Sequence, residues 1–489
     1  MEMSEEWSWP IALAFILYLA GMMCIGLYYS RQQKNLSSYI LGDRKLGPWL
    51  TSMSAEASDM SGWMLMGLPG YAYLHGLSAF WTGIGLIIGT WANWVLVSTR
   101  LRHYTEVANN SLTIPDYLSN RFEEKKNGLR LICALFIILF FIIYTSSGFV
   151  AAGKLFNTIF GLPYFESLLI GAFVVVFYTF LGGFQAVCWT DFYQGLMILG
   201  SLLIAPIFAV SLINPTAVAA IPPDYWNPMA KVTDIISGFG WGLGYFGMPH
   251  IIIRFMSLKS QKEMKKSAVI AISWTALICF FATMVGVVGR MYLGMDENIN
   301  QNSLVFIAMV RSIFPSLMSG ILLSGVLAAS MSTASSQLLA SASAFASDVY
   351  KPVIRKYQSG DKEMLWAGRI VVLVISFVAL LIADSPRAGS IMELVANAWG
   401  VFGAAFGSAI MLSLFWRGFT FQGAVACIIV GAVVDIGWYL TMAASTGIYE
   451  IIPGFFASLV AGVIVSLLSG GPSKDVAELY DKANNYVEE

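Results

Sequence analysis

The chain has 489 residues, of which 57% are hydrophobic and only 12% are charged, and its net charge is −1. So apolar a composition excludes a water-soluble domain of this length and predicts an integral membrane protein in a lipid bilayer. The near-neutral charge gives no sign of a polyanionic partner such as a nucleic acid.

Thirteen apolar stretches follow one another along the chain, each near the ~20 residues that cross the hydrocarbon core. They cover residues 9–29, 50–74, 78–99, 129–153, 163–184, 191–213, 234–255, 267–289, 316–346, 365–384, 390–415, 419–443 and 450–469. The first is expected to be a retained helix, because acidic Glu2, Glu5 and Glu6 precede it where a signal peptide would be basic. Residues 473–489 form a polar tail too short for a signalling domain.

Lysine and arginine are distributed unevenly between the two sets of connections. With the N-terminus outside, the inner connections hold 23 of the 28 basic residues. The outer connections hold only Lys154, Lys231, Arg290, Arg311 and Arg387. By the positive-inside rule, this asymmetry predicts an external N-terminus and a cytoplasmic C-terminus.

The order of the spans predicts an internal repeat. Spans two to six, residues 50–213, and spans seven to eleven, residues 234–415, form two blocks of five. An odd number of spans inverts the second block in the membrane, and inverted repeats place their sites near the midplane on interrupted helices. With an extra span before the blocks and two after them, in residues 419–469, residues 1–489 are expected to form a single transporter domain.

Two spans carry polar residues in their middle. Residues 54–63 include Glu56 and Asp59, and residues 329–336 include Ser332 and Thr333. A carboxylate in a spanning segment costs ~2.5–3.5 kcal/mol on insertion scales, so it marks a pathway or a site. Both compositions predict unwound backbone, which membranes tolerate only around a cavity. The two segments together indicate a protein that moves an ion.

Each of these residues also has an alternative interpretation. Asp59 has two compatible interpretations: the N-cap of the outer half of a broken helix, and a carboxylate that sets the field of a cation site. Glu56 is either a partner carboxylate for Asp59 or a group that faces the inner vestibule. Ser332 and Thr333 are either oxygen ligands or small residues at a helix contact, and composition alone favours packing.

Spans five to seven add further candidates. Trp241, Tyr245 and Pro249 recur at i, i+4 and i+8, so they are expected on one helix face beside a proline kink. Such a face suits a small amphipathic ligand, and an aromatic belt at the membrane interface is the alternative. His250 alone is more typical of a satisfied polar residue. Asp191, at the start of span six, is either a helix cap after a Gly-Gly turn or part of an inner ion exit.

Several strings between Tyr39 and Trp416 resemble the sodium/solute symporter family, and within it the bacterial proline carriers. They are YILGDRKLGP at residues 39–48, ASDMSGWMLMGLPG at 57–70, YTFLGGFQA at 178–186, WGLGYFGMPH at 241–250, MST at 331–333 and WGVFGAAFG at 399–407. The string at 57–70 is the most specific. Two positions depart from the pattern: Glu56 stands where the family more often has a small residue, and Ser336 where some close relatives have cysteine.

The resemblance implies an all-α integral membrane fold of thirteen transmembrane helices, with a LeuT-type five-plus-five inverted repeat. It implies sodium-coupled symport of L-proline into the cell by alternating access, in a bacterial cell membrane. Sodium would be bound by the carbonyls of Ala57, Met60 and Ala329 and the hydroxyls of Ser332 and Thr333, with Asp59 in support. L-Proline would lie near Trp63, Gly67, Tyr144, Trp241, Tyr245 and Pro249. Arg44 and Asp191 would serve inner-side coupling and ion release.

Other functions would require other sequence features. The alternative most similar to proline symport is sodium- or proton-coupled uptake of another amino acid or a compatible solute. A membrane sensor would need a signalling domain, and an intramembrane enzyme would need a nucleophile–base or metal cluster. The three scattered histidines, His75, His103 and His250, supply no such cluster. We therefore expect a transporter, no enzyme activity, and no cofactor apart from sodium as the coupling ion; the oligomeric state stays open.

Overall fold

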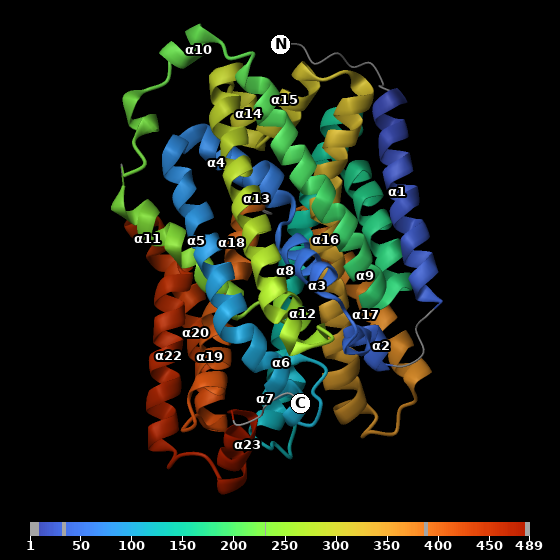
Figure 1. The fold of residues 1–489 in the computed structure, drawn as a ribbon, viewed down its shortest axis with the longest axis vertical. Helices are drawn as coiled ribbons and strands as arrows, with labels where there is room; N and C mark the ends of the chain where they lie inside the picture. The colour runs from blue at the N-terminus through green and yellow to red at the C-terminus, as the bar shows by residue number, and fades with distance from the viewer. Residues whose placement is uncertain (1–8, 32–35, 230, 386–389, 485–489) are drawn as a thin grey trace.

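The computed structural model describes residues 9–31, 36–229, 231–385 and 390–484, and they are helical apart from turns and one bridged pair, Leu46 and Leu258. Figure 1 shows the helices packed roughly side by side in one bundle. Glu2, Glu5, Glu6 and Arg387, and the last five residues of the predicted tail, lie outside the described residues.

Ten helices among the described residues are long and apolar enough to cross a membrane. The uninterrupted ones include α1 (Trp9–Ser30), α8 (Gly128–Phe160), α13 (Met264–Leu293), α16 (Ser316–Ala344), α17 (Asp361–Ala383), α20 (Phe421–Thr441) and α22 (Ile451–Leu468). Another candidate, Trp63–Val107, contains α5 (Phe80–Ala92) and α6 (Ser98–Val107), and a further one consists of α18 (Ile391–Phe402) and α19 (Ser408–Phe415); each pair is joined by a π-helical turn. The tenth is Gly182–Val210. The predicted spans that fall outside this set are split or shorter.

The second predicted span is broken in its middle, as its composition predicted. Helix α3 (Pro48–Asp59) stops at Met60, and the chain resumes in a π-helical turn, Trp63–Gly67, followed by α4 (Leu68–His75). Gly62 lies at the break, where a Cβ atom would be 2.5 Å from the Cβ of Ala151. Only glycine fits this close approach to the neighbouring helix.

The seventh predicted span is also broken, which the sequence did not predict. Helix α11 (Val232–Trp241) passes into a 3₁₀ turn, Gly242–Phe246, and the helix α12 (Pro249–Ser257) starts afresh at its proline. Proline suits the first turn of a helix because its missing N–H has no partner to lose there. The expectation of one continuous face with a proline kink is therefore wrong.

Helix α16, by contrast, runs unbroken through residues 329–336, so the prediction of unwound backbone there is wrong. Two of its serine hydroxyls bond within the helix itself. Ser330 donates to the carbonyl of Val326 at 2.9 Å, and Ser335 donates to that of Ser332 at 3.0 Å. Such bonds to the preceding turn allow serine to lie inside an apolar helix without exposing its hydroxyl.

Helix α9 (Tyr164–Val210) contains two segments that meet at Gly183, whose φ of 61° and ψ of −171° interrupt the helical backbone. A positive φ of this kind is readily available only to glycine. The second segment begins directly after Gly183, so Asp191 lies about two turns inside it. The interpretation of Asp191 as a helix cap is therefore wrong.

Figure 1 places the connections at the two ends of the bundle. One end holds α10 (Pro215–Ala219), α14 (Glu297–Asn302) and α15 (Val305–Ile313), and the other holds α7 (Ile114–Arg121) and α23 (Lys474–Asn484). Five residues of α15 are buried: Val305, Phe306, Ile307, Met309 and Val310. The remaining short helices are α2 (Leu36–Leu41), α12 and α21 (Ala443–Thr446). Helices α3 and α16 lie inside the bundle, so their polar residues are shielded from lipid.

Candidate functional site

The break in α3 releases two backbone carbonyls. In a continuous helix, the N–H of Ser61 would bond to Ala57 and that of Met64 to Met60. Instead, Ser61 donates to the carbonyl of Asp59 at 2.8 Å and Met64 donates to that of Ser61 at 2.9 Å. The carbonyls of Ala57 and Met60, the two predicted sodium ligands of this segment, therefore lose their helical partners.

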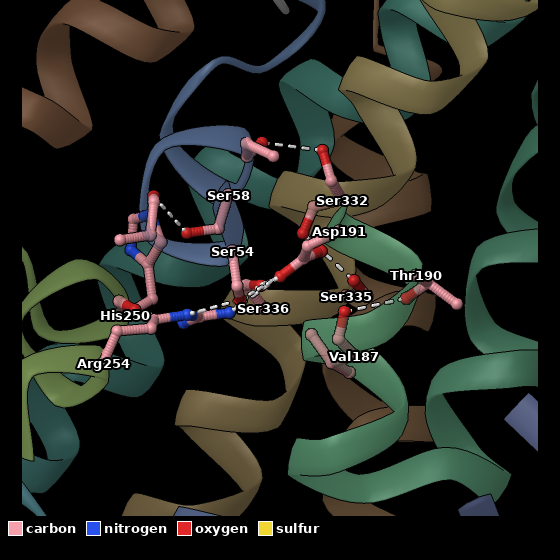
Figure 2. Close-up of polar contacts among 12 residues, drawn as sticks. Ser54, Ser58, Val187, Thr190, Asp191, His250, Arg254, Ser332, Ser335 and Ser336 are labelled. Carbon is pink, nitrogen blue, oxygen red and sulfur yellow. Dashed lines mark hydrogen bonds and ion pairs between the residues drawn. The ribbon is translucent and has the colours of Figure 1, made fainter. Parts of the chain in front are cut away.

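Ser332 of α16 faces this break. Its hydroxyl lies 2.8 Å from the carbonyl oxygen of Ala57 and 3.1 Å from that of Ala329. Figure 2 shows the contact between Ser332 and α3. The next residue, Thr333, is buried, and its hydroxyl has no hydrogen-bond partner among the described residues.

Of the five predicted oxygen donors, the structure brings three within hydrogen-bonding distance: Ala57, Ala329 and Ser332. Thr333 adds an unsatisfied hydroxyl, which is costly inside a membrane protein unless something binds it. Neutral carbonyl and hydroxyl oxygens are the ligands that hard cations such as sodium prefer. The donor set therefore fits a sodium ion held between α3 and α16.

Asp59 is the last residue of α3, and its carboxylate accepts a 2.6 Å hydrogen bond from the hydroxyl of Tyr245. The cap position of the outer half-helix is occupied by Gly62, which makes no side-chain cap bond. The cap interpretation of Asp59 is therefore wrong. Its bond instead joins the first broken span to the second.

An aromatic group lies beside the two breaks. The rings of Trp63 and Trp241 are stacked, with centroids 5.3 Å apart and planes at 19°, and Trp241 also contacts Tyr449 at 5.0 Å. Gly67 belongs to the same turn as Trp63, and a Cβ atom on it would lie 3.2 Å from the Cβ of that tryptophan. Trp241 is only 6% exposed, unlike a ring in a membrane-interface belt.

The other predicted substrate residues are buried around this pair. Tyr245 packs edge-on against Trp399 at 5.1 Å, and Trp399 donates its indole N–H to the carbonyl of Trp241 at 2.8 Å. Tyr144 of α8 lies 6.3 Å, centroid to centroid, from His250, which directly follows Pro249. The structure thus gathers Trp63, Gly67, Trp241 and Tyr245 around the breaks, with Tyr144 and Pro249 on the adjoining helices α8 and α12.

Asp191 belongs to a buried polar network that joins four helices (Figure 2). Its Oδ2 atom accepts from Ser54 at 2.7 Å and from Ser336 at 3.4 Å, and lies 3.1 Å from Arg254 Nη2. Arg254 in turn donates to Ser54 at 3.1 Å and to Ser336 at 2.6 Å. This network connects α3, α9, α12 and α16 through one buried ion pair.

Glu56 faces away from the sodium candidate. Its carboxylate accepts hydrogen bonds from the indole of Trp94 and the hydroxyl of Thr275, both at 2.8 Å, and it is 1% exposed. The alternative of a group in an open inner vestibule is therefore wrong. Glu56 ties α3 to α13 and to the π-helical turn after α5.

Arg44 lies in the connection before α3, at the same end of the bundle as α7. Its guanidinium donates to the carbonyl of Met256 at 2.6 Å, to that of Ser111 at 2.9 Å and to the side chain of Asn110 at 3.0 Å. Burial, with Arg102 nearby, lowers the pKa of Arg44 to about 10, so it stays charged at neutral pH. It joins the end of α12 to the segment that follows α6.

The sequence interpretation missed several residues of these networks. Arg254 carried a usable signal, because a lone charge inside an apolar span marks a functional position. Trp399 begins one of the family-like strings, but nothing local indicates its contact with Tyr245. Trp94 and Thr275 gave no signal, since they meet Glu56 across 38 and 219 residues of chain.

Comparisons with known proteins agree with this architecture. The sodium:solute symporter family model matches residues 39–431. A protein of Staphylococcus saprophyticus named sodium/proline symporter 2 is 44% identical over 500 residues, covering 99% of this chain and 97% of its own. The osmoregulated proline transporter of Bacillus subtilis is 42% identical over 479 residues, covering 96% of this chain and 97% of its own.

Solved structures share the fold at lower sequence identity. A substrate-bound, outward-open sodium-coupled sialic acid symporter superposes with a TM-score of 0.79 at 21% identity, covering 96% of this chain and all of that one. A nucleobase-cation-symport-1 transporter in a closed conformation gives a TM-score of 0.56 at 16% identity, covering 91% of this chain and 98% of that one. The fold is therefore that of multi-helix membrane transporters, as the sequence predicted.

Proposed function

The chain belongs to the sodium:solute symporter family, and from that premise we propose that it couples inward movement of sodium to the uptake of L-proline. Relatives with about the same length are named for proline, and the family is named for sodium. It is a multi-pass protein of a bacterial membrane and a transporter, with no enzyme activity.

The observation that carries this proposal is the contact of Ser332 with the carbonyl of Ala57 at the break in α3. In our proposal, sodium takes the place of that direct contact and is held by the carbonyls of Ala57, Met60 and Ala329 and the hydroxyls of Ser332 and Thr333. The bound ion supplies a positive charge that links α3 to α16. Asp59, at the end of the same helix, makes the site attractive to a cation stripped of water.

Coupling to the substrate follows from the short stretch of chain between Ala57 and Trp63. One end of this stretch contacts Ser332, and the other carries the ring that stacks on Trp241. Asp59, between them, holds Tyr245. Ordering of this stretch by sodium therefore shapes the pocket in which Trp63, Gly67, Tyr144, Trp241, Tyr245 and Pro249 would surround proline. Such coupling requires each ligand to favour the state that binds the other.

We extend the proposal to the topology. The split span of α3–α4, the first segment of α9 and the split span of α11–α12, added to the other helices, give thirteen crossings. In our proposal the N-terminus lies outside, the C-terminus lies in the cytoplasm, and residues 50–213 and 234–415 form inverted repeats in a single domain. The positive-inside distribution supports this orientation. Arg44 and Asp191 then lie toward the cytoplasm and couple inner opening to ion release.

Removing one hydroxyl from the ion site should weaken sodium binding. Ser332→Ala or Thr333→Ala deletes one oxygen contact worth roughly 1–3 kcal/mol, equivalent to about 5- to 150-fold in apparent sodium affinity. Proline affinity at saturating sodium should change much less. Sodium titrations of proline uptake measure both quantities. Ser330→Ala is the matched control, because that hydroxyl bonds within its own helix. Unchanged sodium dependence in both variants would mean that these hydroxyls only pack.

Removing the stacked indole should weaken substrate binding instead. Trp241→Ala deletes the ring that stacks on Trp63, so we expect a loss of about 3 kcal/mol or less, up to ~150-fold in proline affinity. Equilibrium binding of labelled proline at saturating sodium measures it. Trp226→Ala, at an exposed ring outside the pocket, is the control. Normal proline binding by both Trp241→Ala and Tyr245→Ala would place the substrate elsewhere.

Reconstitution tests the function as a whole. Purified protein in liposomes should accumulate labelled L-proline when sodium is higher outside, and should not do so without a sodium gradient. Competition by a panel of other amino acids and compatible solutes defines the substrate. Uptake that follows a proton gradient in the absence of sodium, or prefers another solute over proline, would overturn the proposal.

A further inference from the structure

An open groove of about 520 Å³ runs between α1, α9 and α16. None of its described lining residues is charged, and Leu17, Leu196 and Ile321 on that lining are exposed. The groove therefore opens to the outside of the bundle and offers it an apolar wall. Its ends on α1, Ala14 and Ile25, are roughly 16 Å apart along the helix, about the depth of one leaflet of a ~30 Å hydrocarbon core.

A second hollow, of about 500 Å³, continues the groove along two helices. Tyr29 of α1 and Trp189 of α9 line the hollow, and each lies one helical turn beyond a residue of the groove, Ile25 and Tyr193 respectively. The ring of Trp189 stacks on those of Tyr29 and Tyr193, with centroids 6.0 and 6.4 Å away. In Figure 1 this end of α1 points toward the end of the bundle that holds α7 and α23.

The hollow carries a positive charge and hydrogen-bond donors. Lys45 is the only charged residue in its described lining, and it pairs only loosely with Asp43, at 3.9 Å. Across the part of the chain that the structure describes, neither the Gln185 amide nor the Trp189 indole N–H has a hydrogen-bond partner. A cation with N–H donors suits a phosphate group, and tryptophans such as Trp49 and Trp189 gather at the level of lipid headgroups.

A phospholipid matches both parts at once. The groove takes an apolar chain of one leaflet's length, and the hollow at its end takes a phosphate. A free phosphate ion would use only the hollow, and a second copy of this chain over the groove would leave the charge of Lys45 unused. A zwitterionic headgroup would bring a cation of its own next to Lys45, so the charge favours an anionic lipid.

We propose that the groove and the hollow together form a binding site for one anionic phospholipid of the cytoplasmic leaflet, with an acyl chain in the groove and the phosphate at Lys45. Only the choice of leaflet rests on the proposed topology. The lipid contacts α3 at Pro48 and α16 at Ile321. It therefore touches both helices of the proposed ion site from outside the bundle.

Native mass spectrometry of the full-length protein tests the headgroup part of the site. The protein is reconstituted in nanodiscs with equal amounts of phosphatidylglycerol and phosphatidylcholine, and is then released into detergent. The parent should retain one phosphatidylglycerol with roughly fivefold preference, because a lysine near the membrane surface contributes about that factor. Lys45→Gln should remove the preference and Lys45→Arg should keep it. Lys126→Gln, at an exposed position between α7 and α8, is the control for charge.

A bulky side chain in the groove tests the acyl-chain part of the site. Gly21 lines the groove, and a Cβ atom on it would meet no atom within 4 Å. Gly21→Phe should therefore fold normally and lower lipid retention by roughly tenfold, the equivalent of about two buried methylene groups. Gly437→Phe on α20, where a Cβ atom is equally unobstructed, is the control. If Gly21→Phe does not fold, Leu17→Trp on the same lining replaces it.

Four results would overturn this proposal. They are equal retention of the two lipids by the parent, an unchanged preference in Lys45→Gln, complete displacement of the lipid by inorganic phosphate, and a dimer that Gly21→Phe dissociates. The third would assign the hollow to a free anion, and the fourth would assign the groove to a second copy of the chain. Failure of proline uptake in liposomes, with the lipid retained, would instead overturn the proposed function and leave the lipid site in place.

Discussion

Asp59→Asn should reduce sodium-driven proline uptake at low sodium by roughly a hundredfold or more. The substitution keeps the side chain's size but removes the negative charge at the end of α3 and weakens the charge-assisted bond from Tyr245. Hydrogen bonds to charged groups are worth about 1.5–3 kcal/mol, and the lost attraction for a cation adds to that. Initial rates of uptake across a range of sodium concentrations measure the loss, which we expect mainly as a higher half-saturating sodium concentration.

Two further variants separate charge from hydrogen bonding at this position. Tyr245→Phe removes the hydrogen bond but leaves the carboxylate, so its effect on sodium half-saturation should be smaller than that of Asp59→Asn. Asp224→Asn, at an exposed position in the connection between α10 and α11, is the matched control for charge and should behave as the parent. Should Asp59→Asn keep the parent's sodium dependence, the carboxylate does not act on the ion.

Arg254→Met should be the most destabilising single substitution that we predict. It leaves Asp191 buried with an uncompensated charge, and breaking a buried pair in this way costs about 3–5 kcal/mol. The variant should therefore unfold at a clearly lower temperature in detergent and transport little proline. Thermal unfolding, followed alongside uptake in liposomes, measures both effects.

The double variant Arg254→Met with Asp191→Leu separates stability from transport. Replacing both members of a buried pair by apolar residues of similar size is often neutral or stabilising, so most of the thermal stability should return. Transport should stay low, because Ser54 and Ser336 no longer join α3 and α16 through a charged network. Normal transport by the double variant would show that the pair serves only packing.

Much of the fold could be predicted from the sequence, because a membrane requires apolar helices of spanning length and allows polar residues only at protected positions. Apolar stretches of spanning length located the helices, and Asp59 in the middle of one correctly indicated a break there. The same argument failed at residues 329–336, because serine hydroxyls bond back to their own helix and remove the need to unwind. It also failed at Pro249, where the pattern does not distinguish a kink within a helix from the start of a new one.

The site was readable only in part, because its contacts join distant segments. The resemblance named Ala57 and Ser332 as sodium ligands and Trp241 as a substrate residue. In the structure, each of them lies at or beside a break in a helix. Local sequence gave no sign that Asp59 meets Tyr245 186 residues away, or that Asp191 meets Ser54 across 137 residues. Both pairings depend on the tertiary arrangement of broken helices, and a single sequence does not encode that arrangement in any local pattern.

The joint at Gly183 limits where the molecule tolerates an insertion. The two segments of α9 meet there without a loop, so a tag or protease site placed between them would have to interrupt helical hydrogen bonds. At the same end of the bundle, residues 356–358 lie exposed in a turn between α16 and α17. In the proposed topology this turn faces the cytoplasm, so a fluorescent label or an affinity handle for that side belongs there.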